Sequence, residues 1–209
     1  MRVVLLALLV ALLGCPGKSG DDGKPGPGTN SKEDITKEQA RFDAERKPEK
    51  VVEALKIGPG SRVADIGAGS GLLTVHLARA VAPNGKVVAT DVDGAVLENL
   101  LAARMQAAGL ADVVERRVVE ADRPGLEKED GQYDAILLAE VDHYFVDPVA
   151  WLKSAAKALK PTGRIVISNR VHHRAKAMAA ALKAGLVVEN ESTPVPTHFI
   201  ASFVVGGTK

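Results

Sequence analysis

The residues best suited to hold a small molecule form one glycine-rich turn. Gly67, Gly69 and Gly71 stand at alternate positions after the apolar segment 63–66, and the apolar-periodic run 72–81 follows them. Glycine adopts positive φ and carries no Cβ, so the backbone can approach a ligand closely. A helix over 72–81 would point its unpaired N–H groups at the same place. The pattern predicts a cofactor-binding loop between a strand and a helix.

The spacing of the glycines separates two classes of cofactor. The dinucleotide fingerprint G-x-G-x-x-G/A needs a small third residue for close packing of helix on strand. Counted from Gly67 that position is Leu72, which disfavours a nicotinamide oxidoreductase. An acid followed by G-x-G-x-G instead resembles the first motif of the class I S-adenosylmethionine-dependent methyltransferases. In that family the loop wraps the methionine and ribose of the cofactor, so the resemblance implies these cofactor-binding residues: Asp65, whose carboxylate suits the sulfonium cation, Gly67, Ala68, Gly69 and Gly71.

A second acid lies about twenty residues beyond the loop. Segment 86–91 reads as a strand that ends in Asp91, where a carboxylate can accept both ribose hydroxyls of a nucleoside. The alternative role, an N-cap for the next helix, suits Asp93 better. The resemblance implies that Val92 lies along the adenine ring. It also implies that Asp122, after the third strand, meets the adenine amino group, with a solvated loop acid as the alternative.

Acid, imidazole and phenol groups follow the fourth expected strand, 133–140. This strand is apolar on both faces, as a central parallel strand is. It brings Glu140, Asp142 and His143 to the carboxyl edge of the sheet, where ligands of open α/β sheets bind. We assign Glu140 to the cofactor site. Asp142 and His143 are candidate general bases, needed only if the methyl acceptor loses a proton; a packed, hydrogen-bonded His143 is the alternative.

The order of the expected elements defines the fold class. Strands and helices alternate from Arg62 to Ser168, which predicts a parallel sheet with helices on both faces. The resemblance covers residues 36–205 and implies a three-layer, Rossmann-like α/β methyltransferase fold, with a mostly parallel seven-stranded sheet and an antiparallel last strand. No residues show metal-ligand spacing.

The N-terminus has the pattern of a secretion signal. Met1 and Arg2 precede the apolar run 3–13, which is shorter than the ~20 residues that a membrane-spanning helix needs. The run ends in Leu-Leu-Gly-Cys, which resembles a bacterial lipobox with Cys15 as the lipidated first residue of the mature protein. Cys15 is the only cysteine, so no internal disulfide can form. A buried core segment is the alternative for this run.

These signals divide the chain into three parts. We expect a signal peptide at 1–14, a lipidated cysteine and disordered tether at 15–34, and a methyltransferase domain at 35–209. Removing residues 1–14 deletes Arg2 and no acid, so 27 basic residues become 26 against 26 acidic ones. A neutral chain with 3% aromatic residues argues against a nucleic-acid partner. The expected location is the cell envelope, on the periplasmic side of a bacterial membrane, with the lipid anchor as the only membrane contact.

The expected function is transfer of a methyl group from S-adenosylmethionine to a small-molecule acceptor. The Asn-Pro-Pro-Tyr motif of methyltransferases that act on amide or base nitrogens is absent after the fourth strand, which disfavours those substrates. The alternative is an envelope lipoprotein that keeps a nucleoside-binding fold without turnover, because S-adenosylmethionine is made in the cytoplasm. The sequence makes no prediction of the acceptor or of the oligomeric state.

Overall fold

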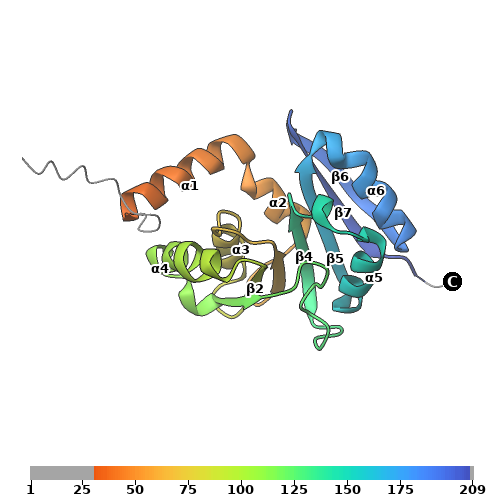
Figure 1. Ribbon diagram of the computed structural model, residues 1–209, viewed down its shortest axis with the longest axis horizontal. Coiled ribbons are helices and arrows are strands. Elements are labelled where there is room, and N and C mark those ends of the chain that lie inside the picture. Colours follow the sequence, from red (N-terminus) through yellow and green to blue (C-terminus); the bar gives the residue numbers. More distant parts are fainter. Residues whose placement is uncertain (1–30, 208–209) are drawn as a thin grey trace, which may run out of the picture.

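A seven-stranded sheet forms the centre of the computed structural model, which describes residues 31–207 (Figure 1). The strand order is β3-β2-β1-β4-β5-β7-β6. The strands are β1 (Arg62–Ile66), β2 (Lys86–Asp91), β3 (Val114–Val118), β4 (Tyr133–Ala139), β5 (Leu159–Arg170), β6 (Leu186–Val195) and β7 (His198–Val205). Strand β7 runs antiparallel to both of its neighbours, and the other neighbouring pairs are parallel. The predicted fold class, including the antiparallel last strand, is confirmed. The segments expected to be a signal peptide and a tether, with Cys15, lie outside the described residues up to residue 30.

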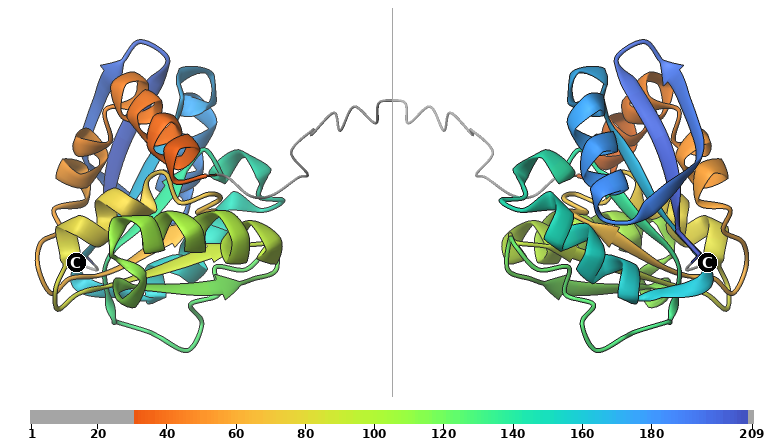
Figure 2. Two further views of the ribbon diagram at one scale, coloured as in Figure 1. Left: turned by 90° about the vertical axis from the view of Figure 1, so that its left-hand side faces the viewer. Right: turned by 90° about the vertical axis from the view of Figure 1, so that its right-hand side faces the viewer.

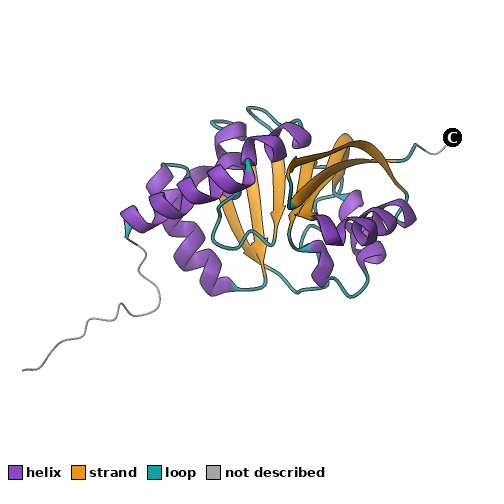
Figure 3. Ribbon diagram, turned by 90° about the horizontal axis from the view of Figure 1, so that it is seen from above, coloured by secondary structure: helices purple, strands orange, loops and turns teal. Residues whose placement is uncertain are grey.

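Helices cover both faces of the sheet (Figures 2 and 3). They are α1 (Lys32–Arg46), α2 (Pro48–Leu55), α3 (Thr74–Val81), α4 (Ala102–Ala108), α5 (Pro148–Lys157) and α6 (Arg174–Lys183). One apolar cluster joins the sheet to α2, α3 and α4, and a second joins it to α5 and α6. Alternate residues of β1 enter the two clusters, Val63 on one face and Ala64 on the other. Such two-sided burial explains the nearly continuous apolar runs of the central strands.

Helix α1 is attached differently from the other helices. Ser31 and Asp34 form a capping box at its start, and Ile35 is its only buried residue. Its attachment is polar: the buried Arg104 of α4 donates to the Ile35 carbonyl at 3.3 Å and to Gln39 Oε1 at 3.0 Å. The same guanidinium donates to the Ser70 carbonyl at 2.8 Å. Arg104 therefore links α1 to the glycine-rich loop.

Three boundaries that the sequence predicts differ from the structure. The sequence predicts a helix over 95–108, and the structure has a π-helical segment, Val96–Leu101, which α4 continues. The sequence Lys-Pro-Thr-Gly at 160–163 predicts a turn before a fifth strand at 164–168, but these residues lie within β5, where they form a bulge between the paired positions Leu159 and Arg164. Helix α1 begins at Lys32, inside the segment that the composition assigned to the tether.

Candidate functional site

The glycine-rich loop follows β1, and its three glycines have different roles. Gly67, Gly69 and Gly71 have φ values of +68°, +52° and +83°. A Cβ on Gly67 would lie 2.8 Å from Val141 Cγ2, and one on Gly71 would lie 2.9 Å from Leu101 Cγ. A Cβ on Gly69 would meet nothing within 4 Å. The outer two glycines therefore allow close packing, and the middle one leaves open space above the loop.

Asp91 joins the end of β2 to this loop. Its Oδ2 accepts the Gly69 N–H at 2.8 Å, and its Oδ1 accepts the Asp93 N–H at 3.0 Å. Each carboxylate oxygen keeps a second lone pair for a ligand. Asp93 Oδ1 accepts the N–H groups of Ala95 and Val96 at 2.9 and 3.2 Å, which confirms the expected capping role of Asp93.

A cavity of about 230 Å³ opens beside the loop at the carboxyl edge of the sheet. Four residues of the predicted cofactor site line it: Gly67, Asp91, Val92 and Glu140. The lining also includes Thr90 and Trp151, whose buried Oγ1 and Nε1 atoms have no hydrogen-bond partner in the described chain. Buried polar atoms without partners are uncommon, so these two favour a polar ligand in the cavity.

Five other residues of that predicted set lie outside the cavity lining: Asp65, Ala68, Gly69, Gly71 and Asp122. Asp122 is exposed, and its neighbours Ala121 and Arg123 line the cavity instead. Asp65 is buried beneath the loop, where its Oδ2 accepts the Thr74 hydroxyl at 2.7 Å. Since β1 is covered on both faces, the Asp65 carboxylate ties the start of α3 to the sheet and does not reach the cavity.

Burial raises the pKa of the Asp65 carboxyl to about 6, although the Thr74 hydrogen bond opposes the rise. Because this value exceeds the ordinary value of 3.8, stability falls as pH rises between the two values. The full difference corresponds to about 3 kcal/mol. Asp65→Asn keeps an oxygen for Thr74 and removes the charge. We expect its stability advantage over the parent to grow by about 2 kcal/mol between pH 4.5 and pH 7.5.

Urea unfolding of both proteins across this pH range measures the effect. Asp112→Asn, which changes an exposed acid, is the matched control and should show no such trend. A difference between parent and Asp65→Asn that stays constant with pH would mean that Asp65 does not titrate in this range.

Glu140 follows β4, which β1 separates from β2 and Asp91, and the part of the cavity that Glu140 lines is called its Glu140 end. Glu140 has a positive φ of 55°. Its carboxylate forms an ion pair with Arg46, the last residue of α1. His198 Nε2 lies 3.3 Å from Glu140 Oε1, and Arg170 Nε lies 3.6 Å from Oε2. Burial opposes ionisation, but Arg46 and these neighbours still hold the pKa of Glu140 below its ordinary value. The ends of α1, β4, β5 and β7 thus meet around one ionised carboxylate.

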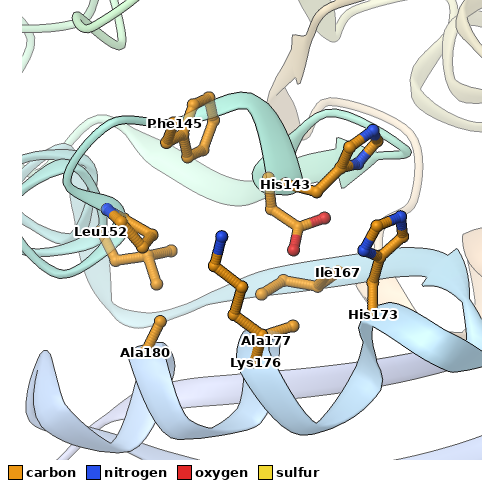
Figure 4. Close-up of a pocket in the computed structure, with 10 residues that line it drawn as sticks. His143, Phe145, Leu152, Ile167, His173, Lys176, Ala177 and Ala180 are labelled. Atoms are coloured by element: carbon orange, nitrogen blue, oxygen red, sulfur yellow. The ribbon is translucent and has the colours of Figure 1, made fainter.

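Asp142 and His143 border a different hollow, between the loop after β4 and helix α6 (Figure 4). Asn169 Nδ2 donates to Asp142 Oδ1 at 2.6 Å and lies 3.0 Å from His143 Nδ1. Because the Asn169 amide nitrogen is a donor, His143 Nδ1 accepts with its lone pair. In a neutral ring the proton is then on Nε2. The His143 ring stacks on His173 at 4.3 Å between centroids. Burial raises the pKa of the Asp142 carboxyl.

The sequence reading missed Arg46, Arg170 and His198. Arg46 lies 94 positions from Glu140 in the chain, so no local spacing could associate them. Arg170 lies two residues beyond the fifth expected strand, 164–168, and this position was the only available signal. In residues 31–207, no group of His, Cys, Asp and Glu side chains is arranged to hold a metal ion. No helix in the same range is long and apolar enough to cross a membrane.

Comparisons with known proteins agree with this geometry. Residues 64–165 match the family model described as a methyltransferase domain. A solved S-adenosylmethionine-dependent methyltransferase from Aquifex aeolicus has the same fold, with a TM-score of 0.71 and 22% identity over 84% of this chain and 98% of that one. The chain therefore has the fold of the class I methyltransferases, and residues 64–165 are similar to a methyltransferase domain. The cofactor to which this fold and domain family point is S-adenosylmethionine.

Two curated relatives are named as methyltransferases of quinone biosynthesis. A ubiquinone biosynthesis O-methyltransferase of Xanthomonas campestris is 30% identical over 146 residues, which are 70% of this chain and 57% of that protein. A ubiquinone/menaquinone biosynthesis C-methyltransferase of Ectopseudomonas mendocina is 32% identical over 116 residues, 56% of this chain and 44% of that protein. The chain spans about half the length of these relatives. One of them methylates oxygen and the other carbon, so similarity alone does not identify the acceptor atom.

The residues present fit the cofactor. The backbone N–H groups of Ser70 and Leu72 donate to no acceptor in the described chain, so they remain available to an anionic group beside the loop. Asp91 has lone pairs for ribose hydroxyls, and the side chain of Val92 is exposed beside it. The glycine-rich loop and the cavity beside it together offer N–H donors, a carboxylate and an apolar surface, which match the polar and apolar parts of a nucleoside joined to an amino acid.

Proposed function

We propose that the protein transfers a methyl group from S-adenosylmethionine to a small-molecule acceptor. One observation carries the proposal: a single cavity is lined both by Gly67 and Asp91, which suit the cofactor, and by Glu140 and Tyr144, which leave room for an acceptor. The cofactor supplies a methyl group that is already activated. The protein then has to hold the acceptor nucleophile in line and exclude water, and such positioning contributes up to about 7 to 11 kcal/mol.

Calorimetry with the full chain tests the cofactor. S-adenosylmethionine and S-adenosylhomocysteine should bind with one site per chain, and NAD should not bind. Binding of NAD without binding of S-adenosylmethionine would contradict the proposal and would favour a nicotinamide oxidoreductase instead. Binding of S-adenosylmethionine without turnover of any acceptor would favour the lipoprotein that keeps the fold without catalysis.

His143 and Asp142 remain the candidate general bases for an acceptor that loses a proton. Nε2 of a neutral His143 carries the proton, so catalysis would require a change of tautomer and loss of the Asn169 contact. We expect His143→Gln to lower turnover ~100-fold and to keep cofactor affinity within about threefold. Single-turnover rates and calorimetry on the folded variant measure both quantities. A joint loss of melting temperature, affinity and rate would identify a structural histidine.

We further propose that the chain is a lipid-anchored protein of the bacterial cell envelope, with residues 1–14 removed and with the tether, expected at 15–34, ending before α1 begins at Lys32. The support is the sequence alone: a charged start, an apolar run and a single cysteine at position 15. The domain would then face the periplasm and meet the membrane only through its anchor.

Cys15→Ala should abolish lipidation, because thioether formation requires the Cys15 thiol. Metabolic labelling with a radioactive fatty acid should mark the parent and leave the variant unmarked as a longer precursor. Ser19→Ala, four residues away, is the matched control and should be labelled like the parent. Label on the Cys15→Ala protein, or none on the parent, would contradict the anchor.

A further inference from the structure

The Glu140 end of the cavity carries a positive charge that the protein does not neutralise. Arg46 and Glu140 form an ion pair and cancel. Burial and the nearby Arg46 keep the pKa of His198 below its ordinary value, so this imidazole is neutral at pH 7. Arg170 is the remaining charged group that contacts this cluster in the described chain. The net charge of the cluster is therefore +1.

The Arg170 guanidinium is free to bind a ligand. Its side chain is 62% exposed, and its contact with Glu140, at 3.6 Å, is longer than a hydrogen bond. Within residues 31–207, the side-chain nitrogens of Arg170 form no hydrogen bond. The Arg174 guanidinium, four residues later, already has an acceptor, because its Nη2 donates to Glu191 Oε2 at 2.7 Å. Arg170 thus offers unused N–H groups beside Glu140, which lines the cavity.

The neighbouring groups determine which anion suits this position. A guanidinium presents two parallel N–H groups that match the two oxygens of a carboxylate. A single negative charge would balance the cluster. A phosphate dianion would overcompensate it and would be repelled by the adjacent Glu140 carboxylate. Tyr144 lines the same cavity and is 75% exposed, so its ring offers an apolar surface for the body of an acceptor.

We propose that the methyl acceptor carries a carboxylate, and that Arg170 binds this group at the Glu140 end of the cavity. The inference rests on the proposed methyl transfer and adds the chemical class of the acceptor. Arg170 is then a residue that determines specificity: it holds the acceptor by a group remote from the reacting atom.

The cofactor also has a carboxylate, and the test must separate the two anions. The free N–H groups of Ser70 and Leu72 in the glycine-rich loop provide a separate position for the cofactor carboxylate. If Arg170 serves the acceptor, Arg170→Gln should leave the affinity for S-adenosylhomocysteine within about twofold of the parent value.

The experiment uses the full chain saturated with S-adenosylhomocysteine. Calorimetry compares two matched pairs of probes, 3,4-dihydroxybenzoate with its amide and indole-3-acetate with its amide, on the parent, Arg170→Gln and Arg174→Gln. We expect at least one acid to bind the parent about tenfold more tightly than its amide. Arg170→Gln should remove that preference, Arg170→Lys should restore part of it, and Arg174→Gln should keep it.

Three results would overturn the inference: no acid of either pair is preferred to its amide, the preference survives in Arg170→Gln, or Arg170→Gln weakens S-adenosylhomocysteine binding tenfold or more. The last result would assign Arg170 to the cofactor carboxylate. Failure of the parent to bind S-adenosylhomocysteine at all would instead refute the proposed function, and the acceptor inference with it.

Discussion

Asp91→Ala should weaken the binding of S-adenosylmethionine by about 2 to 4 kcal/mol. Two hydrogen bonds from ribose hydroxyls to a charged acceptor would be lost, each worth about 1.5 to 3 kcal/mol with partial compensation by water. The variant also loses the acceptor of the Gly69 N–H, so the loop itself would be less well fixed. Calorimetry on the folded variant measures the change in affinity.

Two companion variants separate these effects. Asp91→Asn keeps one acceptor oxygen and should lose less affinity than Asp91→Ala. Asp93→Ala removes the neighbouring acid that caps the following helix, so it should cost about 1 kcal/mol of stability and leave affinity unchanged. Parent-like affinity in folded Asp91→Ala would place the ribose elsewhere. An equal loss in Asp93→Ala would indicate a general effect of charge near the cavity.

Gly67→Ala should lower the free energy of unfolding by about 2 to 5 kcal/mol. The positive φ costs a residue with a Cβ about 1 to 2 kcal/mol. The added methyl would also lie 2.8 Å from Val141 Cγ2, and overpacking of this kind costs about 1 to 3 kcal/mol. Because Gly67 and Val141 both line the cavity, cofactor affinity should fall as well.

Gly69→Ala is the matched control within the same loop. It has a positive φ but open space around its Cβ, so only the backbone cost of about 1 to 2 kcal/mol should appear. The double variant Gly67→Ala/Val141→Ala should recover part of the loss, because it removes the contact, and the two changes should not be additive. Equal destabilisation by the two single glycine variants in urea unfolding would exclude the Val141 contact as a cause.

The local patterns of the sequence were sufficient for the alternation of strands and helices, and the resemblance to a family implied the antiparallel last strand. Segment 86–91 is strand β2, and the last strand, which the sequence predicts over 198–205, is β7 with the same boundaries. Each strand is an apolar run with turns or polar residues at its ends. Such signals depend only on neighbouring residues in the chain. The boundaries failed where tertiary packing overrides local preference, as in the bulge of β5.

The cavity was partly predictable for the same reason. Gly67 and Glu140 follow parallel strands and Asp91 ends one. Because parallel strands end at one edge of a sheet, the chain positions of these residues alone bring them to the same side. Position along a strand does not decide which way a side chain points beyond its end. Asp65 and His143 illustrate this, because one lies beneath the loop and the other borders the hollow at α6.

By itself, the sequence determined the class of fold, the glycine-rich loop and the acid at the end of β2, because each is encoded in a few consecutive residues. Only the tertiary structure decided the surroundings of Glu140. Arg46 reaches it because α1 packs across the loop, and His198 reaches it because β7 returns antiparallel beside β5. Contacts between residues so far apart in the chain depend on the packing of whole elements, and that packing has no signature in local spacing.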